Sequence, residues 1–159
     1  EKGISERFLG NGIGCNRVDL CRFRQQGVAV INTTVIIDLK RGEDVYIANV
    51  VKCRPPNNRN PESAEMRCCE PYLTRQIELI QPRLIVALGK IAASHLLQTD
   101  ASIASLRGRV HDYHGTPLIV TYHPAYLLRT LPDKAKSWAD LCFARDTMRA
   151  LASDARAAS

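Results

Sequence analysis

The chain lacks both a hydrophobic run that could cross a membrane and a secretory leader pattern. No apolar segment approaches the roughly 18 residues that a membrane-spanning helix requires. The N-terminus has no basic stretch followed by an apolar one, which is the pattern of a signal peptide. We therefore expect an intracellular, cytoplasmic protein that does not bind membranes.

The sequence also lacks a phosphate-binding glycine motif. Gly10, Gly12 and Gly14 are evenly spaced, but the third glycine of a GxGxxG pattern and the flanking strand and helix are missing. No internal repeat or low-complexity segment occurs either. The sequence therefore does not indicate nucleotide binding by a glycine-rich loop, or a repeat architecture.

The composition is that of one folded domain. Hydrophobic residues make up 45% and charged residues 24% of 159 residues, which is enough for one sizeable core. The formal net charge is +6, and an excess of basic groups favours anionic partners such as nucleic acid. A basic enzyme without such a partner has the same charge, so charge supports nucleic-acid binding without establishing it.

From residue 45 onward the pattern is α/β. Apolar strand patterns cover residues 45–51, 84–88 and 118–122, and helical patterns cover residues 60–80, 90–97 and 133–152. The first of these helices is expected to begin with Asn60 as its N-cap, directly before Pro61. We expect an α/β fold of three layers (α/β/α) with a mostly parallel central sheet. The buried face of the last helix is expected to include Trp138, Leu141 and Met148.

The first 44 residues are of a different kind. They contain a β-branched run at residues 28–37 and few helix signals. We treat residues 1–159 as a single domain, in which residues 1–44 form an atypical N-terminal region and residues 45–152 a recognisable core.

Two polar residues stand at the ends of expected strands. Asn49 lies late in VYIANVV, and His123 directly follows LIVTY. Ligands of open α/β sheets bind beyond the carboxyl ends of the strands. An amide offers a donor and an acceptor to a base edge, and a histidine can donate to an oxygen that gains negative charge. A structural asparagine and a turn histidine are the alternative interpretation.

The cysteines form a second group. Cys53 and Cys69 are separated by fifteen residues, with Cys68 as a competitor, and Cys15 and Cys21 could complete a four-thiolate set for iron–sulfur or zinc. The alternative is that these thiols pack as small apolar groups. Cys142 lies within a helical pattern and is expected in the core.

Basic residues and an apolar tip lie near the expected strand ends. A cluster of arginines could clamp phosphates, although solvated surface charge is the commoner role; these are Arg54, Arg59, Arg107, Arg109 and Arg129. Tyr126, Leu127 and Leu128 could fill the gap that an extruded base leaves, or could be buried in the core.

Several motifs resemble, in order and spacing, those of the iron–sulfur uracil-DNA glycosylases of family 4. The resemblance covers about residues 40–150. Its motifs are NVVKCRPP from Asn49, CEPYL from Cys69, RQIELI from Arg75, IVALG from Ile85, LRG from Leu106 and YHPAYLLR from Tyr122.

The resemblance implies a role for each matching residue. Asn49 would hydrogen-bond uracil, and His123 would stabilise negative charge on the departing base. Cys53 and Cys69 would hold a [4Fe–4S] cluster, with Cys69 preferred over Cys68 because it begins CEPYL. Arg107, Tyr126, Leu127 and Arg129 would contact uracil-containing DNA. The implied reaction is hydrolysis of the N-glycosidic bond of a flipped base, by a chain that we expect to be monomeric.

The N-terminal region departs from the family pattern. The family's Gly-Glu-Ala-Pro-Gly motif, which supplies an acid that positions water, is absent, as is the segment with an aromatic residue that stacks on uracil. Cys15 and Cys21 are spaced differently from the family's Cys-x-x-Cys pair, so they are weaker candidates as ligands. A catalytically impaired DNA-binding or metal-stabilised relative, and a small-molecule α/β enzyme, are the competing hypotheses.

Overall fold

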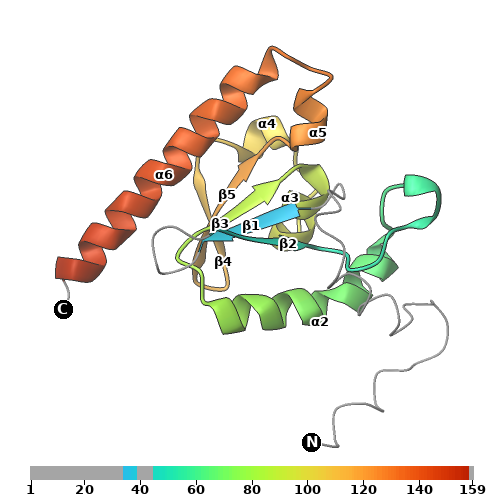
Figure 1. The fold of residues 1–159 in the computed structure, drawn as a ribbon, viewed down its shortest axis with the longest axis horizontal. Coiled ribbons are helices and arrows are strands. Elements are labelled where there is room, and N and C mark those ends of the chain that lie inside the picture. The colour runs from blue at the N-terminus through green and yellow to red at the C-terminus, as the bar shows by residue number, and fades with distance from the viewer. Residues whose placement is uncertain (1–33, 39–44, 158–159) are drawn as a thin grey trace, which may run out of the picture.

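Strand β3 (Ile85–Leu88) lies at the centre of the sheet, because its sequence IVAL is apolar throughout and all four residues are buried. In the computed structural model, which describes residues 34–38 and 45–157, the strands form one sheet in the order β2-β1-β3-β5-β4 (Figure 1). The other strands are β1 (Thr34–Asp38), β2 (Val45–Asn49), β4 (Val110–Tyr113) and β5 (Thr116–Thr121).

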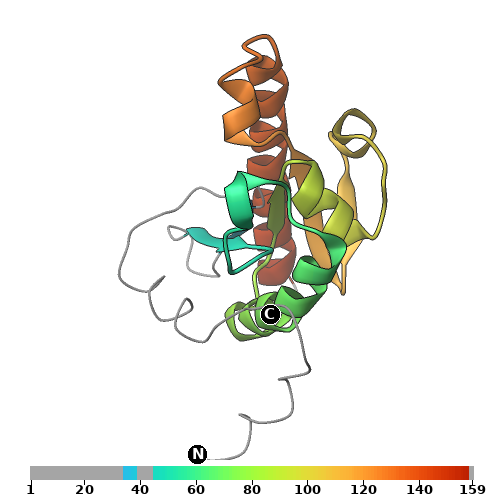
Figure 2. The same ribbon diagram turned by 90° about the vertical axis from the view of Figure 1, so that its right-hand side faces the viewer.

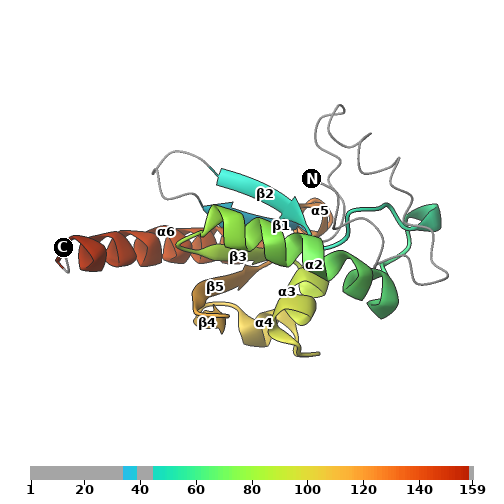
Figure 3. The same cartoon turned by 90° about the horizontal axis from the view of Figure 1, so that it is seen from below.

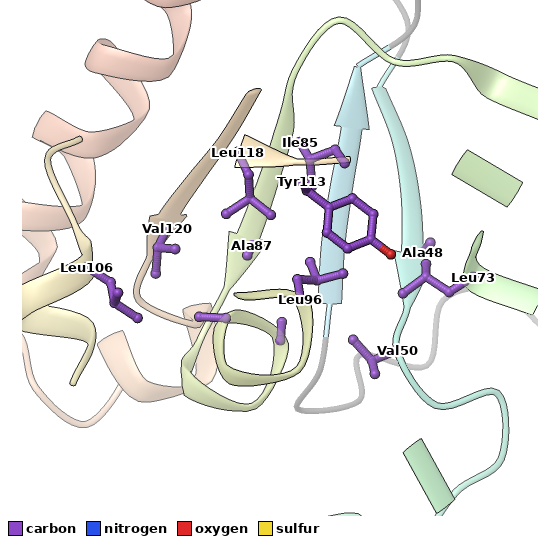
Figure 4. Close-up of a cluster of buried hydrophobic side chains, with 12 residues drawn as sticks. Ala48, Val50, Leu73, Ile85, Ala87, Leu96, Leu106, Tyr113, Leu118 and Val120 are labelled. Atoms are coloured by element: carbon purple, nitrogen blue, oxygen red, sulfur yellow. The ribbon is translucent and has the colours of Figure 1, made fainter. Parts of the chain in front are cut away.

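Helices cover both faces of this sheet (Figure 3). Alternate strand residues point to opposite faces, and the two faces have separate apolar clusters. One cluster joins Ile85, Ala87, Leu118 and Val120 to the helices α2 (Ser63–Ile80), α3 (Lys90–Leu97) and α4 (Ile103–Leu106), as Figure 4 shows.

The other cluster packs against the long helix α6 (Asp133–Ala157), which crosses the opposite face (Figures 1 and 2). It contains Val86, Leu88 and Ile119 of the sheet together with Ala144. The expected three-layer α/β/α arrangement is therefore confirmed. Two short helices, η1 (Pro56–Asn58) and α5 (Pro124–Leu127), lie in the loops after β2 and β5.

The direction of the strands differs from the expectation. Of the four pairings, only β3 with β5 is parallel, and the expectation of a mostly parallel sheet is wrong. Six residues separate β1 from β2, and a connection this short permits only antiparallel pairing, because a parallel crossover needs a dozen or more residues. Strands β2, β3 and β5 nevertheless run in the same direction, since β1 is antiparallel to both of its neighbours.

Strand β4 was not expected from the sequence. It forms an antiparallel hairpin with β5 through His114 and Gly115, which both have positive φ angles. Two such residues fit the tight turn that matches the twist of a hairpin. The weakly apolar sequence VHDY concealed this strand, which closes one edge of the sheet.

Helix α2 begins later than predicted. Its N-cap is Glu62 and not Asn60, because the Glu65 carboxylate accepts a hydrogen bond of 2.8 Å from the Glu62 N–H. The same carboxylate pairs with Arg59 at 2.8 Å. The end of the helix agrees with the expected position at Ile80.

The predicted buried face of α6 is wrong for two of its three residues. Trp138 and Leu141 are 69% and 42% exposed, and only Met148 packs against the core. The buried stripe of the helix is instead polar in its first half and consists of Asp133, Ser137, Asp140 and Ala144. Cys142, expected in the core, is half-buried.

None of the helices in the described part of the chain is sufficiently long and apolar to cross a membrane.

The core predicts a sharp contrast between two leucines. Leu118 is fully buried, whereas Leu79 on α2 is 68% exposed. Leu118→Ala should lower the free energy of unfolding by about 2–5 kcal/mol, because it removes buried methyl groups and leaves a cavity. Leu79→Ala should change it by no more than about 0.5 kcal/mol. Denaturant unfolding of the two variants checks this, and equal losses would contradict the packing described.

Candidate functional site

The carboxyl ends of β2, β3 and β5 lie at the same edge of the sheet. Register pairs Thr34 with both Asn49 and Leu88, and Leu88 with Thr121. Asn49 is the last residue of β2, and His123 follows the end of β5 by two residues. The structure therefore brings the two expected residues to one edge.

Two strands, β1 and β3, separate Asn49 from the strand that leads to His123. Neighbouring strands are about 4.8 Å apart, so three steps place the backbones of β2 and β5 about 14 Å apart. Their side chains can therefore face a planar ligand from two sides, with the ends of the central strands between them.

His123 is held in one orientation. It is 7% exposed and is the N-cap of α5, where its Nδ1 accepts a hydrogen bond of 3.1 Å from the Ala125 N–H. Because Nδ1 accepts, the proton of the neutral ring lies on Nε2. The imidazole thus has a hydrogen-bond donor on the side away from the loop backbone.

Gly89 allows the close approach of β3 to this histidine. Its N–H donates to the Thr121 carbonyl at 2.8 Å, which extends the pairing of β3 and β5 by one residue. A Cβ added to Gly89 would lie 3.0 Å from the His123 Cβ, and the φ of +89° favours glycine. The glycine after the strand is therefore part of the packing that positions His123.

Asn49 is held through its backbone by Lys52. The Lys52 Nζ donates to the Asn49 carbonyl at 2.7 Å and to Gln76 Oε1 on α2 at 2.5 Å. Gln76 Nε2 in turn donates to the Tyr46 hydroxyl at 3.0 Å. Burial lowers the pKa of Lys52 to about 8, an effect that the nearby Cys69 thiol partly opposes. Sequence reasoning missed both Lys52 and Gln76, because neither stands at a strand end.

Cys53 and Cys69 come from separate elements that meet. The Lys52 N–H donates to Cys69 Sγ at 3.3 Å, so Cys53, the next residue, lies in the loop against α2. Cys69 is buried and Cys68 exposed, which supports Cys69 as the inward-facing thiol. Across residues 34–38 and 45–157, no group of three or more His, Cys, Asp or Glu side chains gathers. Cys15 and Cys21 lie outside the described residues.

These two thiols fit half of a four-thiolate set. Iron–sulfur clusters are held by cysteine thiolates, and hydrogen bonds to their sulfurs adjust their potential. The N–H of Lys52 is already placed as such a donor to Cys69.

The arginines expected near the strand ends differ in exposure and in their partners. Arg107 is half-buried, and the others are exposed: Arg54, Arg59, Arg109 and Arg129. Arg54, Arg59 and Arg107 have partners within the chain: Asn58, Glu65 and Asp140 respectively. Arg107 pairs with Asp140 at 2.8 Å, so its expected DNA contact remains a prediction and its visible role is internal.

The side chains of the apolar tip after His123 differ in exposure. Leu128 is 76% exposed, Tyr126 is partly exposed and Leu127 is half-buried. The Tyr126 ring stacks on Tyr122 with centroids 5.2 Å apart, and its hydroxyl donates to Asp133 Oδ2 at 2.8 Å. This contact is consistent with a fixed tip beside the histidine.

A hollow of about 650 Å³ lies elsewhere, between α2 and the β4–β5 turn. Tyr113, His114 and Thr116 line it together with Gln81 and Pro82, which precede β3. It therefore lies toward the amino ends of β3 and β5, away from Asn49 and His123, and does not belong to the candidate site.

Comparison with known proteins agrees with this geometry. Residues 7–142 match the family described as the Uracil DNA glycosylase superfamily. The chain is 47% identical over 105 residues to a type-4 uracil-DNA glycosylase of Saccharolobus solfataricus, which covers 61% of this chain and 48% of that protein. It is 52% identical over 91 residues to the type-4 enzyme of Thermotoga maritima, covering 56% of this chain and 47% of that protein.

A more distant relative is a type-5 uracil-DNA glycosylase of Pyrobaculum aerophilum, 38% identical over 85 residues, which cover 52% of this chain and 37% of that protein. The alignments with the two type-4 enzymes span about half the length of those enzymes.

The close approach of Gly89 to His123 gives a testable contrast between two glycines. Gly115 has a φ of +83°, but nothing lies within 4 Å of an added Cβ, so Gly115→Ala adds backbone strain alone. Gly89→Ala adds strain at a φ of +89° and a ψ of 167°, and also the contact with His123. Strain of this kind costs about 1–3 kcal/mol, and Gly89→Ala should lower the free energy of unfolding by more than Gly115→Ala. Denaturant unfolding measures both, and equal losses would refute the close contact.

Proposed function

Because the chain belongs to the Uracil DNA glycosylase superfamily, we propose that it is a uracil-DNA glycosylase that flips uracil out of DNA and hydrolyses its N-glycosidic bond in base excision repair. The observation that carries this proposal is the common sheet edge of Asn49 and His123. The proposed substrate is uracil-containing DNA, and we propose a monomeric, cytoplasmic protein.

Recognition is the role of Asn49. Its side-chain amide offers one acceptor and two donor hydrogens, which is the complement of the alternating carbonyl and N–H groups on the edge of uracil. The Lys52 bond to the Asn49 carbonyl holds the backbone from which this amide projects. A base that is paired in a duplex cannot present this edge to Asn49, so the nucleotide must first be flipped out of the duplex.

Departure of the base is assisted by His123. Cleavage of the N-glycosidic bond leaves negative charge on uracil, and the Nε2–H of a neutral imidazole can donate to the oxygen that carries it. The Ala125 N–H on Nδ1 favours the tautomer that this donation needs. The proton stays on Nε2, so the histidine stabilises the anion without having to be charged.

The exposed segment that follows would contact DNA. Tyr126 and Leu127, together with Leu128, would fill the space that the flipped base leaves, and Arg129 would contact a phosphate. The net charge of +6 supports this contact through attraction to the phosphate backbone. Arg107 would support the segment from within.

We propose that Cys53 and Cys69 are two of four ligands of a [4Fe–4S] cluster, with Cys15 and Cys21 as the weaker candidates for the other two. The similarity of the chain to type-4 uracil-DNA glycosylases is compatible with this assignment. When bound, such a cluster would fasten the loop after β2 to α2. The meeting of Lys52 with Cys69 supports the pairing.

A second candidate is a relative that binds uracil-containing DNA without cleaving it. The acid that positions water in the family follows its first strand, and that motif is absent here. In addition, the first residue of strand β1 lies at the site and the last does not. Thr34 is level with Asn49, whereas Asp38 is level with Val45. The strand end that would carry the acid is therefore at the far edge of the sheet.

An activity assay separates the two candidates. Wild-type protein should release uracil from a uracil-containing oligonucleotide and leave an abasic site. Asn49→Ala should weaken recognition, and His123→Ala should lower kcat by about 10²–10³-fold, as loss of an oxyanion donor does. His114→Ala is the matched control, because this exposed turn residue lies at the opposite edge of the sheet.

Binding without abasic product would exclude the glycosylase and support the binding relative. If neither binding nor product depended on Asn49 and His123, both candidates would be refuted.

The cluster proposal has a readout other than activity. Anaerobically purified wild-type protein should contain iron and absorb broadly in the visible range. Cys69→Ser and Cys53→Ser should lower the iron content, whereas Cys68→Ser should not, because that thiol is exposed. Iron and acid-labile sulfide analysis checks this. A colourless protein that contains zinc would overturn the assignment of the metal.

A further inference from the structure

The carboxylate of Asp140 on α6 is buried, and both of its oxygens accept hydrogen bonds. It is 2% exposed, and its Oδ2 accepts hydrogen bonds from Thr121 Oγ1 at 2.8 Å and from Arg107 Nε at 3.0 Å. Its Oδ1 accepts from Arg107 Nη2 at 2.8 Å. The Ser137 hydroxyl lies 3.0 Å from Thr121 Oγ1 in the same group. The residue that follows α4, the end of β5 and helix α6 therefore meet at one carboxylate.

Thr121 connects this carboxylate to the segment that carries His123. Thr121 is the last residue of β5, and its side chain faces α6 because its neighbour Val120 faces α3. Its backbone carbonyl accepts from Gly89, and His123 follows two residues later. The hydrogen bond to Asp140 thus fixes the point at which the chain leaves the sheet toward His123.

Arg107 also contacts the segment that leads from β5 to His123. Its Nη2 also donates to the Lys136 carbonyl at 2.5 Å, and its Cζ lies 5.8 Å from the centroid of the Tyr122 ring. A guanidinium over an aromatic face is attracted to it. Because Asp140 orients Arg107, it also acts on Tyr122, the residue directly before His123.

The far end of the segment is tied to the same helix. Tyr126 stacks on Tyr122, and its hydroxyl donates to Asp133, which pairs with Lys136 at 2.7 Å. The residues around His123 are therefore connected to α6 both before and after the histidine.

Packing alone does not explain a buried ion pair at this place. A well-packed apolar group of similar volume often stabilises a fold as well as a buried ion pair does. Directed hydrogen bonds, however, fix geometry more narrowly than apolar contacts can. The choice of a carboxylate in the buried stripe of α6 therefore points to a requirement for geometry.

We propose that Asp140 is a positioning residue for His123, acting through Thr121 and Arg107. It does not touch the substrate. This inference rests on the proposed function in so far as its kinetic test requires uracil release. A displacement of about 1 Å at a reacting group can cost about 10²-fold in rate, so loosening the segment should lower kcat more than it raises KM.

The test compares Asp140→Asn with Asp146→Asn. Asp146 is an exposed aspartate of the same helix that pairs with Arg145, so it controls for the loss of one negative charge. Asp140→Asn should lower kcat for uracil release by about 10–100-fold with KM changed by less than about threefold. Asp146→Asn should behave as the wild type.

A second pair of variants removes the link without removing the charge. Thr121→Val keeps the side-chain shape but loses the hydroxyl that donates to Asp140, and Thr121→Ser retains that hydroxyl. Thr121→Val should show the same fall in kcat, and Thr121→Ser should recover most of it. This pair also decides the case if Asp140→Asn fails to fold.

A spectroscopic readout separates positioning from the reaction itself. The ring nitrogens of His123, assigned with a His123→Gln sample, should give the ¹⁵N shifts of the Nε2–H tautomer in the wild type. Asp140→Asn and Thr121→Val should shift them or broaden them, while Thr121→Ser and Asp146→Asn should not. This measurement holds even if the wild type releases no uracil, in which case the proposed function fails and the positioning role does not.

Unchanged ring shifts in both Asp140→Asn and Thr121→Val would overturn the inference, as would a loss of stability without any change at His123. A parallel rise of KM with unchanged kcat would also overturn it.

Discussion

The parallel pairing of β3 with β5 is the constraint on which the site depends. It sets Leu88 level with Thr121, and the Gly89 N–H extends the pairing to the Thr121 carbonyl. The residues that follow the two strands then lie close together, and Gly89 after β3 makes room for His123, two residues after β5. Asn49 reaches this edge because β2 runs in the same direction as both strands.

The site consists of two halves that are held in different ways. The Asn49 half is supported from α2, through Gln76 and Lys52, on the same helix that carries Cys69. The His123 half is supported from α6, through Asp140, on the opposite face of the sheet. Each helix layer thus fixes one side of the proposed uracil pocket, and the sheet sets the distance between them.

Much of this arrangement could be predicted from the sequence. The strands around Val86 and Ile119 are continuous apolar runs, and the polar residues at strand ends identified Asn49 and His123 because sheet geometry places ligands there. The choice of Cys69 over Cys68 came from a resemblance, and the burial of Cys69 supports it.

The remaining features depend on residues outside the element in question. Helical periodicity placed Trp138 inside, but the structure buries Asp140 instead, because this carboxylate pairs with Arg107, 33 residues away. The direction of β1 followed from the length of its connection to β2, and the hairpin of β4 from two residues with positive φ. The residue pattern of a single strand shows neither, because strand direction and pairing depend on the connection and on the neighbouring strand.

The central claim is that Asn49 and His123 face one uracil base. Titration of the free base into ¹⁵N-labelled protein, followed through the Asn49 side-chain amide and the His123 ring nitrogens, tests this most directly. Both signals should move together along one saturation curve, with a single dissociation constant. A response from only one of the two residues, or from neither while the base binds elsewhere, would contradict the account.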